Sequence, residues 1–357
     1  MKAFTIDGRA LGLDQPTYFI ADIAANHDGS LDRARALIRM AKEAGADAAK
    51  FQHFRAEQIV SEAGFSKINE KSSHQASWTK SVVEVFREAS VPADWTPYLK
   101  EECDQVGITF LSTPYDFGSA EALSPYVQAF KVGSGDINWL EFISFLAAKG
   151  KPLLIATGAS ALSEVDLAVS VVEQSDVPLV VMQCNTNYTG DDENHAYVNL
   201  RVIPAFVERY QKCLVGLSDH TTDLGVVLGA VAMGARVIER HFTDDTSREG
   251  PDHSFAMDPS AWDTMVRETR KLELSLGDGV KKVEANERAA LVVQRRSIRF
   301  VCSKESGEMV GREDLELLRP YEDGSFQPSD LQNVVGRKLK LDVQAGEALR
   351  PEMLIDE

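Results

Sequence analysis

Eight short apolar segments, each followed by a stretch long enough for a helix, run through the first 277 residues of this chain. These segments are continuous rather than alternating and rich in Val, Ile, Leu and Phe, which is typical of strands covered on both faces. The predicted strands span residues 18–24, 48–52, 108–112, 129–133, 152–157, 179–184, 214–218 and 235–242. Eight strands that alternate with helices match a closed (β/α)8 barrel, so we predict this α/β fold, the TIM barrel, for residues 1–277.

The connecting segments contain helices with a 3.6-residue apolar repeat, clearest at residues 30–46, 163–174 and 259–276. In the first of these, Ser30 is the predicted N-cap and Gly45 the predicted stop. A doubly wound open sheet is the alternative fold for such a pattern. That fold usually carries a glycine-rich fingerprint after its first strand, whereas this chain reads ADIAANHDG there, so the barrel is favoured.

The pattern changes after Gly277. Residues 278–296 are polar and charged and are predicted to form a linker or connecting helix. Residues 297–357 consist of short segments separated by the turn sequences SGE, DGS and AGE. We predict a small β-rich domain there, close to the lower size limit for independent folding.

Composition excludes several classes of partner. The formal net charge of −17 repels nucleic-acid phosphates and anionic lipid. No segment has the roughly 20 consecutive apolar residues of a membrane span, and the N-terminus lacks the apolar run of a secretory signal. The four cysteines are scattered without a C-x-x-C pair, which favours reduced thiols and a cytoplasmic location.

Polar residues gather at the carboxyl ends of the predicted strands, where barrels of this kind place their active sites. They are Asp22, Lys50, Gln52, Ser112, Thr113, Lys131, Ser134, Thr157, residues 184–188, Ser218, Asp219, His220, Glu239 and His241. Ionisable groups inside apolar strands cost several kcal/mol unless they are paired or used. Their repetition at one end of the barrel therefore predicts a functional site.

His220 and His241 follow or end neighbouring strands, so their imidazoles could bind one divalent ion. Two nitrogen ligands, with water and substrate oxygens completing the shell, suit Mn²⁺ or a similar ion. No H-x-x-x-H motif is present, and the alternative is two unrelated histidines, one of them a core residue.

Lys50 and Lys131 lie within apolar strands and need an anion nearby to stay charged. Together with the backbone N–H groups of residues 133–135, they favour a phosphate or carboxylate site. A Schiff-base lysine is one alternative. Internal ion pairs are the other, with Asp22, Asp136 or Glu239 as partners.

Three further features are open at this point. Asp22 could act as a general base or could neutralise the lysines. Residues 26–29, Asn-His-Asp-Gly, are predicted to form a turn and helix entry rather than a catalytic dyad. The long excursion over residues 53–92 is predicted to pack over the barrel mouth, with a lid as the alternative.

These residues lie in motifs that resemble the sialic acid synthase family, which includes N-acetylneuraminate, legionaminate and pseudaminate synthases. The resembling stretches are ADIAANHDGSLDRARALIRMAKEAGADAAKFQ, STPYDF, FKVGSGDI, KPLLIATGAS, GLSDHT, IERHFTDDTSREGPDH and LLRP. They cover nearly the whole chain. The resemblance implies a (β/α)8 barrel followed by an antifreeze-like (SAF) domain, in a domain-swapped homodimer whose small domain caps the partner's barrel.

The resemblance also implies roles for individual residues. It makes His220 and His241 metal ligands. It places Lys50, Thr113, Lys131, Ser134 and Ser218 around phosphoenolpyruvate, with Asp136 and Thr186 also in the substrate site. Gln52, Tyr188 and Asp252 would contact the sugar, and Arg319 of the small domain would reach the neighbouring subunit's site.

Two departures from the family pattern concern the same site. Asp22 stands where the family usually has Glu, and it is shorter by one methylene, so a base role would need a water or a shifted backbone. Thr186 stands where the family has an Asn that contacts ligand, and Asn185 or Asn187 would have to compensate.

The resemblance implies a metal-dependent synthase that joins phosphoenolpyruvate to an open-chain N-acetylated hexose resembling N-acetylmannosamine. The products are a nine-carbon 2-keto acid and phosphate, formed by C–O cleavage with catalytic Asp22, His220 and His241. The expected cofactor is Mn²⁺, with Mg²⁺ or Co²⁺ as alternatives. A Schiff-base pyruvate–sugar lyase and a non-catalytic binding homologue are the alternative functions.

Overall fold

The computed structural model describes residues 3–67, 78 and 80–355. The chain divides into two compact units, Met1–Gly277 and Asp278–Glu357, and each is described by itself. None of the helices within the described residues combines the length and the apolar character needed to cross a membrane.

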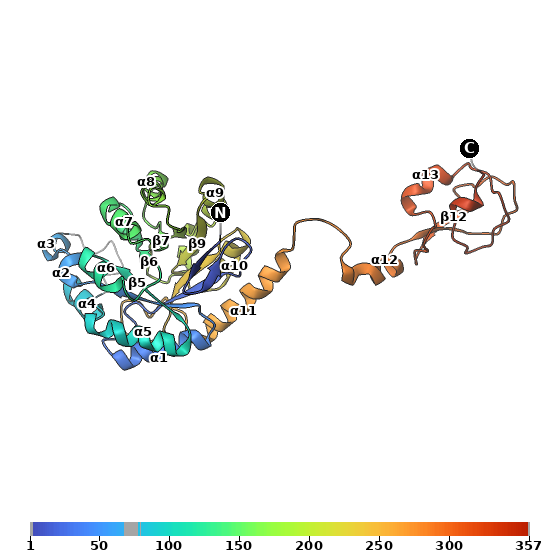
Figure 1. Ribbon diagram of the computed structural model, residues 1–357. Coiled ribbons are helices and arrows are strands. Elements are labelled where there is room, and N and C mark those ends of the chain that lie inside the picture. The colour runs from blue at the N-terminus through green and yellow to red at the C-terminus, as the bar shows by residue number, and fades with distance from the viewer. Residues whose placement is uncertain (1–2, 68–77, 79, 356–357) are drawn as a thin grey trace. The chain divides into compact units, whose positions relative to one another are not determined.

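The first unit is built on a closed barrel of eight parallel strands in the order β10-β3-β4-β5-β6-β7-β8-β9 (Figure 1). The strands are β3 (Tyr18–Asp22), β4 (Ala48–His53), β5 (Thr109–Pro114), β6 (Phe130–Val132), β7 (Leu153–Ala156), β8 (Leu179–Cys184), β9 (Leu214–Asp219) and β10 (Val237–His241). Each strand lies inside its predicted range or extends at most two residues beyond it. The predicted (β/α)8 barrel is confirmed, and the open-sheet alternative is excluded.

Helices surround the strands (Figure 1). They are α1 (Leu31–Glu43), α5 (Thr96–Val106), α6 (Phe117–Leu123), α7 (Leu140–Ala147), α8 (Leu162–Glu173), α9 (Val202–Arg209), α10 (Gly225–Ala232) and α11 (Pro259–Leu276). Helix α1 begins as predicted, because Ser30 Oγ accepts the N–H of Arg33. Gly45 follows the helix with φ +91°, a left-handed conformation that glycine adopts without strain.

The excursion between β4 and β5 contains additional helices. They are α2 (Ala56–Ile59), α3 (Glu62–Phe65), α4 (Val82–Ala89) and the 3-10 turn η3 (Ala93–Trp95). Helix α4 begins with a capping box, in which Ser81 Oγ accepts the N–H of Glu84 and the Glu84 carboxylate accepts the N–H of Ser81. Residues 68–77 and 79 of the predicted excursion lie outside the described part of the chain.

The barrel interior changes character along its axis. Side chains two residues apart on a strand point to the same face. At the amino-terminal half the inward residues are apolar, and they pack with Ile6 and Leu11 of a hairpin formed by β1 (Phe4–Ile6) and β2 (Arg9–Leu11). Two residues further along, Ile20 gives way to Asp22. The hairpin was not predicted from the sequence. It packs against the apolar half of the barrel interior, so a functional site can form only in the polar half, at the carboxyl ends of the strands.

The second unit has its own apolar core. It contains η6 (Ala285–Glu287), α12 (Arg288–Gln294), β11 (Ser297–Phe300), β12 (Leu315–Leu318), η7 (Pro328–Asp330), α13 (Leu331–Val334) and η8 (Pro351–Met353). The core residues are Ile298, Phe300, Val310, Leu315, Val334, Leu339, Val343, Leu349, Met353 and Leu354. Within the described part of this second unit, the regular strands are β11 and β12. They pair antiparallel, and single β-bridges supplement them.

Candidate active site

Four buried charged side chains form the centre of the polar half of the barrel. Lys50 Nζ lies 2.7 Å from Asp22 Oδ2, and Lys131 Nζ lies 2.8 Å from Glu239 Oε1. Lys50 Nζ is also 3.9 Å from Glu239 Oε1, which joins the two pairs into one cluster. Their side chains are no more than 6% exposed. Of the three carboxylates considered as partners, the described residues thus pair the lysines with Asp22 and Glu239 and not with Asp136.

Neutral polar groups surround this cluster. Lys50 Nζ donates to Thr113 Oγ1 at 3.4 Å, and Gln52 Nε2 donates to Asp22 Oδ2 at 3.2 Å. Ser218 Oγ donates to Glu239 Oε1 at 3.3 Å. The second oxygen of Glu239 is buried and has no hydrogen-bond partner in the described residues. An unmet buried acceptor is costly, so this oxygen marks a position where a ligand or water would donate.

The cluster keeps Asp22 and Lys50 ionised. Burial alone raises the pKa of the Asp22 carboxyl, but the Lys50 ammonium and His241 outweigh burial, and the pKa lies below its usual value. Burial lowers the pKa of Lys50, whereas Asp22 and Glu239 raise it, and the net pKa lies above its usual value. Asp22 and Lys50 are therefore both charged at neutral pH.

The two predicted histidines lie together beside the charged cluster. Their ring centroids are 5.5 Å apart. His220 Nδ1 lies 2.9 Å from the carbonyl oxygen of Asn185, which fixes that nitrogen as the donor and makes Nε2 the nitrogen that could bind an ion. His241 Nε2 lies 3.8 Å from Asp22 Oδ2. Tyr188 packs on both rings, with centroid separations of 4.4 Å and 6.4 Å.

This pair fits the two-histidine metal site predicted from the sequence. A ring centroid lies about 3.3 Å from an ion bound to one of its nitrogens, so 5.5 Å allows a shared ion. His241 Nδ1 is buried without a partner in the described residues, and burial lowers the pKa of His241, which favours the neutral, ligating form. No group of three or more His, Cys, Asp or Glu side chains among the described residues could hold a metal, so other ligands would be water or substrate.

The loops after β6, β7 and β8 pack tightly against one another. Ser134 Oγ accepts the N–H of Gly158 at 3.0 Å. A Cβ on Gly158 would lie 1.8 Å from Thr186 Oγ1, so only glycine fits there. The Thr186 side chain is thus in close contact with the Gly158 backbone. Its neighbours are also engaged in the loop, because Asn185 supplies its carbonyl to His220 and the Asn187 side chain accepts the N–H of Thr189.

Asp136 lies in the 3-10 turn η4 (Ser134–Asp136), two residues from Ser134. Partial burial raises the pKa of its carboxyl to about 6. A carboxyl with such a pKa changes its charge close to physiological pH, so its protonation state is sensitive to a ligand nearby.

A cavity of about 230 Å³ opens beside His241. Its lining residues are Ala25, Gln52, Phe54, Ile59, Trp78, Val85, Phe86, Ala89, Tyr115, Tyr188, His241, Pro251 and Asp252. The three residues predicted to contact the sugar, Gln52, Tyr188 and Asp252, are therefore brought together around one cavity. Asp252 Oδ2 accepts the N–H of Ala25 at 3.1 Å, which links the loops after β10 and β3.

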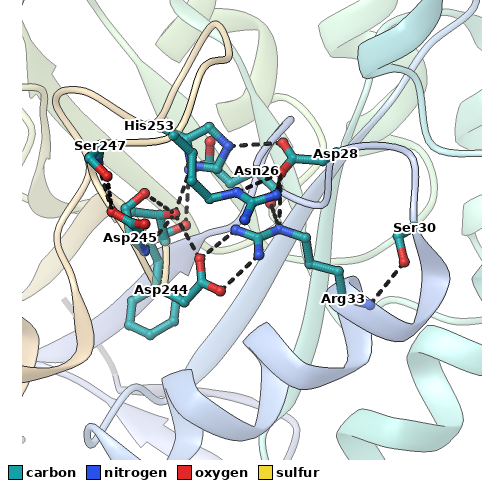
Figure 2. Close-up of polar contacts among 11 residues, drawn as sticks. Asn26, Asp28, Ser30, Arg33, Asp244, Asp245, Ser247 and His253 are labelled. Carbon is teal, nitrogen blue, oxygen red and sulfur yellow. Dashed lines mark hydrogen bonds and ion pairs between the residues drawn. The ribbon is translucent and has the colours of Figure 1, made fainter.

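A network of charged side chains fixes these two loops to each other (Figure 2). His253 is fully buried, and its Nε2 lies 2.9 Å from Asp28 Oδ1. Arg33 donates to Asp244 at 2.7 Å and to the carbonyl of Asn26 at 2.8 Å. Arg248 donates to Asp28 at 2.9 Å. We call these five side chains, Asp28, Arg33, Asp244, Arg248 and His253, the loop clasp.

The backbone agrees with the predicted role of residues 26–29. Asp28 and Gly29 have φ values of +50° and +69°, and α1 begins two residues later. The segment is a turn that enters the helix, as predicted, and it also supplies a partner for the loop after β10.

Arg319 lies in the second unit, where it is exposed and its Nε donates to the carbonyl of Gln294 at 2.6 Å. Its predicted role at a neighbouring subunit's site stays a prediction.

Two more residues lie in the site: Glu239, predicted only as a possible ion-pair partner of the lysines, and Tyr115, for which there was no prediction. Glu239 is two positions before His241 on β10, and the two-residue period of a strand puts both side chains on the inner face. That period was the signal for Glu239. Tyr115 directly follows β5 and lines the cavity, but no sequence pattern distinguishes it from a core aromatic.

Comparison with known proteins agrees with the fold. The NeuB family model matches residues 37–281, and the SAF domain model matches residues 305–355. The chain is 36% identical to N,N'-diacetyllegionaminic acid synthase of Legionella pneumophila, over 95% of this chain and 94% of that protein. It is 32% identical to human N-acetylneuraminate-9-phosphate synthase, over 97% of this chain and 95% of that protein.

Solved structures give the same answer. A crystal structure of N-acetylneuraminic acid synthetase from Leptospira borgpetersenii, in complex with citrate, matches with a TM-score of 0.71 and 26% identity. The match covers 81% of this chain and 95% of that chain. With its family model, its relatives and its barrel in agreement, this chain belongs to the NeuB family and carries a SAF domain.

Proposed function

We propose that this protein is a nonulosonic acid synthase that condenses phosphoenolpyruvate with an open-chain N-acylated aldehyde sugar. The products are a nine-carbon 2-keto acid and phosphate. The observation that carries the proposal is the buried cluster of two lysines and two carboxylates beside the histidine pair. The relatives are synthases of legionaminic acid and of phosphorylated N-acetylneuraminate, which supports the same reaction class.

The charge of the cluster supports a divalent metal. Lys50 and Lys131 are each balanced by a carboxylate, so the four groups together are close to neutral. Phosphoenolpyruvate brings a carboxylate and a phosphate of about −1.5 to −2. His220 and His241 would hold a cation such as Mn²⁺, with Mg²⁺ or Co²⁺ as alternatives. When bound, that ion would neutralise ligand charge and polarise the aldehyde oxygen.

Burial lowers the pKa of the His220 imidazole, but the neighbouring Cys184 outweighs burial, and the pKa lies above its usual value. Because only the neutral imidazole binds a metal, a proton and the ion would compete for His220.

The lysines position phosphoenolpyruvate. Lys50 and Lys131 bind its anionic groups, and Thr113, Ser134 and Ser218 add hydrogen bonds to them. This orients the C3 atom of phosphoenolpyruvate toward the aldehyde carbon, which Gln52, Tyr188 and Asp252 hold in the adjoining cavity. Holding both reactants in one geometry removes most of the entropic cost of a bimolecular step.

The bond changes then balance. C3 bonds to the aldehyde carbon, and the aldehyde oxygen takes up a proton. Water adds to C2 and gives up one proton, which balances the proton taken up by the aldehyde oxygen. The new C2 hydroxyl then gives its remaining proton to the departing phosphate as the C2–O bond to phosphate breaks and the 2-keto group forms. Asp22 stays ionised because of Lys50, so it orients this water rather than storing its proton. The free oxygen of Glu239 can accept a hydrogen bond from the water or from a protonated substrate group.

The domain organisation adds a second part to the proposal. Arg319 of the SAF domain serves the site of a partner subunit in a domain-swapped homodimer. The support for this is the resemblance of the LLRP segment to the sialic acid synthase family, in a part of the chain that the SAF domain model matches.

Two other functions stay as outcomes to test. A Schiff-base lyase needs a neutral nucleophilic lysine, but Asp22 and Glu239 raise the pKa of Lys50. Membership of a family of synthases also speaks against a lyase. A non-catalytic binding homologue would keep phosphoenolpyruvate affinity without turnover.

Phosphate release distinguishes these functions. The protein is incubated with phosphoenolpyruvate, Mn²⁺ and a panel of 2-acetamido and 2,4-diacetamido hexoses. We expect phosphate only when an aldehyde sugar is present. Borohydride trapping of a lysine adduct would establish the lyase instead, and phosphoenolpyruvate binding without phosphate release for any sugar would establish the binding homologue.

A further inference from the structure

Two charged side chains on the outer face of the barrel strands are as deeply buried as those in the site. Arg240 is 1% exposed and Asp219 is 4% exposed. Asp219 ends β9 directly before His220, and Arg240 directly precedes His241 at the end of β10. Successive residues on a strand point to opposite faces. Because Ser218 faces the site, Asp219 points outward, and the same period turns Arg240 outward.

Arg240 holds the loop between β9 and α10 at both of its ends. The two strands are neighbours, and Asp219 stands opposite Arg240 in their register. Arg240 Nε lies 3.4 Å from Asp219 Oδ2, and Arg240 Nη1 donates to the carbonyl of Asp223 at 2.6 Å. The first contact fixes the start of the loop, and the second fixes its end, two residues before α10 begins. His220 lies between these two fixed points.

The Asp219 carboxylate also sets the conformation of the turn that contains His220. Its Oδ1 accepts the N–H of Thr221 at 3.2 Å, and its Oδ2 accepts the Thr221 hydroxyl at 2.8 Å. A side chain that accepts the N–H of the second residue after it closes an Asx turn, which restricts the backbone of the residue between them. That residue is His220, so the carboxylate restricts the position of the His220 imidazole.

Stability alone is a weak explanation for the pair of Asp219 and Arg240, which we call the outer ion pair. Two charges removed from water regain their lost hydration free energy only when their contact is close and their other polar atoms have partners. Here the contact is 3.4 Å, and Arg240 Nη2 is buried without a hydrogen-bond partner in the described residues. The outer ion pair therefore contributes a fixed geometry more than free energy of folding.

The two imidazoles need that fixed geometry because they come from different strands. Their ring centroids are 5.5 Å apart. Each ligating nitrogen has to lie about 2.1 Å from a shared ion, with a tolerance of about 0.2 Å. A shift of the loop after β9 by about 1 Å relative to β10 would therefore remove one of the two ligands.

We propose that Asp219 and Arg240 are positioning residues that hold His220 where it and His241 can bind one divalent ion. This inference rests on the two-histidine metal site of the proposed function and assigns two further residues to that site. Both side chains act from the outer face of the strands, through the backbone that carries the ligands. The outer ion pair thus determines the affinity for the metal, and the buried lysine cluster determines the affinity for phosphoenolpyruvate.

Asp219→Asn and Asp47→Asn form a matched pair of variants. The Asp47 side chain is only 7% exposed, pairs with Arg9 and accepts the N–H of Phe19 at 2.9 Å. It directly precedes β4, at the end of the barrel opposite the site. Each variant loses an ion pair of the barrel, so both should unfold at a lower urea concentration. Only Asp219→Asn should bind Mn²⁺ more weakly, by at least about 10-fold.

Mn²⁺ binding is measured without substrates, from the electron paramagnetic resonance signal of the free ion. Phosphoenolpyruvate binding, titrated without metal, should stay within about 2-fold of the parent chain in both variants, because the lysine cluster is unchanged. Parental Mn²⁺ affinity in Asp219→Asn, or an equal loss of Mn²⁺ affinity in Asp47→Asn, would overturn the inference.

Thr221→Val gives a milder test that serves even if Asp219→Asn does not fold. It keeps the outer ion pair and nearly the same side-chain shape, and it removes only the hydroxyl that donates to Asp219. Mn²⁺ affinity should fall about 3- to 10-fold, the effect of losing one hydrogen bond. Unchanged Mn²⁺ affinity in folded Thr221→Val would contradict the role of the turn.

Phosphate release separates this inference from the proposed function. If Asp219→Asn binds Mn²⁺ more weakly than the parent chain, yet the parent releases phosphate with no sugar, the synthase proposal fails and the positioning role stands. If the parent releases phosphate with a sugar and Asp219→Asn keeps the parental Mn²⁺ affinity, the positioning role fails and the synthase stands. A parent chain that binds none of Mn²⁺, Mg²⁺ and Co²⁺ would overturn the metal site and this inference together.

Discussion

Lys131 shows how one residue serves both stability and binding. Its ammonium pairs with Glu239 inside the barrel, so Lys131→Met removes the nearest cation of a buried carboxylate and leaves only the longer contact with Lys50 among the described residues. We expect this variant to lose about 3–5 kcal/mol of folding stability and to bind phosphoenolpyruvate at least about 100-fold more weakly. Urea unfolding and phosphoenolpyruvate titration measure the two effects.

The double variant Lys131→Met/Glu239→Gln separates them. It removes both charges, so most of the lost stability should return while binding stays weak. Recovery of binding together with stability would show that Lys131 acts only through folding.

His53 makes the barrel sensitive to acid. Its ring is buried between Ser112 Oγ at 2.7 Å and Thr96 Oγ1 at 2.9 Å, and burial lowers its pKa to about 4. The unfolded residue titrates near 6.5. Above pH 6.5 His53 is neutral in both the folded and the unfolded chain, so its ionisation does not change the free energy of unfolding. As pH falls from 6.5 to 4, only the unfolded chain gains the proton, so stability drops by up to about 3 kcal/mol.

His53→Gln tests this contribution. The variant has no titrating ring, so its loss of stability between pH 6.5 and 4 should be smaller than in the parent chain by about that amount. Urea unfolding at half-unit pH steps gives the comparison. Parallel curves for the two proteins would assign the acid sensitivity to other groups.

At the scale of elements, the loop clasp determines where Asp252 lies. Asp28→Asn weakens its pairs with His253 and Arg248 without changing the size of the side chain. We expect the KM for the sugar to rise about 10-fold while the KM for phosphoenolpyruvate stays within about 2-fold.

Asp245→Asn is the control for the clasp. Asp245 lies on the same loop, but within the described part of the chain its carboxylate accepts hydrogen bonds from Ser247 alone. Steady-state kinetics should match the parent chain. A similar rise of both KM values in Asp28→Asn would indicate general loosening of the barrel rather than positioning of Asp252.

The strands and the main helices could be predicted because each carries its own signal. Continuous apolar runs encode strands buried on both faces, and Ser30 and Gly45 mark the limits of α1 through local hydrogen bonding and backbone conformation. The hairpin β1–β2 has strands of only three residues each, too short for a periodic pattern to emerge. Its position depends on packing against the barrel interior.

The site was predictable only in part, for a related reason. A strand period places Asp22, Lys50, Lys131 and His241 at one end of the barrel, and they do lie there. Which lysine pairs with which carboxylate depends on strand register and barrel closure. The cavity beside His241 depends on how α2 and α4 pack around it, and no local sequence pattern encodes that packing.

At the scale of the whole molecule, the proposed swapped dimer predicts complementation between two inactive variants. His241→Ala damages the barrel site, and Arg319→Ala damages the contribution of the SAF domain. In a swapped heterodimer of the two, one site carries both changes and the other carries neither, so activity should be about half that of the parent dimer.

Two affinity tags allow the heterodimer to be purified after co-expression. Each homodimer serves as its own control and should be inactive. A heterodimer as inactive as the homodimers would mean that Arg319 acts within its own chain or not at all. Recovery of a monomer as the active species would contradict the dimer proposal outright.

The central claim is that this barrel joins phosphoenolpyruvate to an aldehyde sugar by breaking the C–O bond of the enol phosphate. Phosphoenolpyruvate labelled with ¹⁸O at the bridging oxygen tests it directly, with the released phosphate analysed by ³¹P NMR. The account predicts that the phosphate carries the label and forms only when the sugar is present. Unlabelled phosphate, with the ¹⁸O left on the keto product, or labelled phosphate formed equally well without sugar, would contradict it.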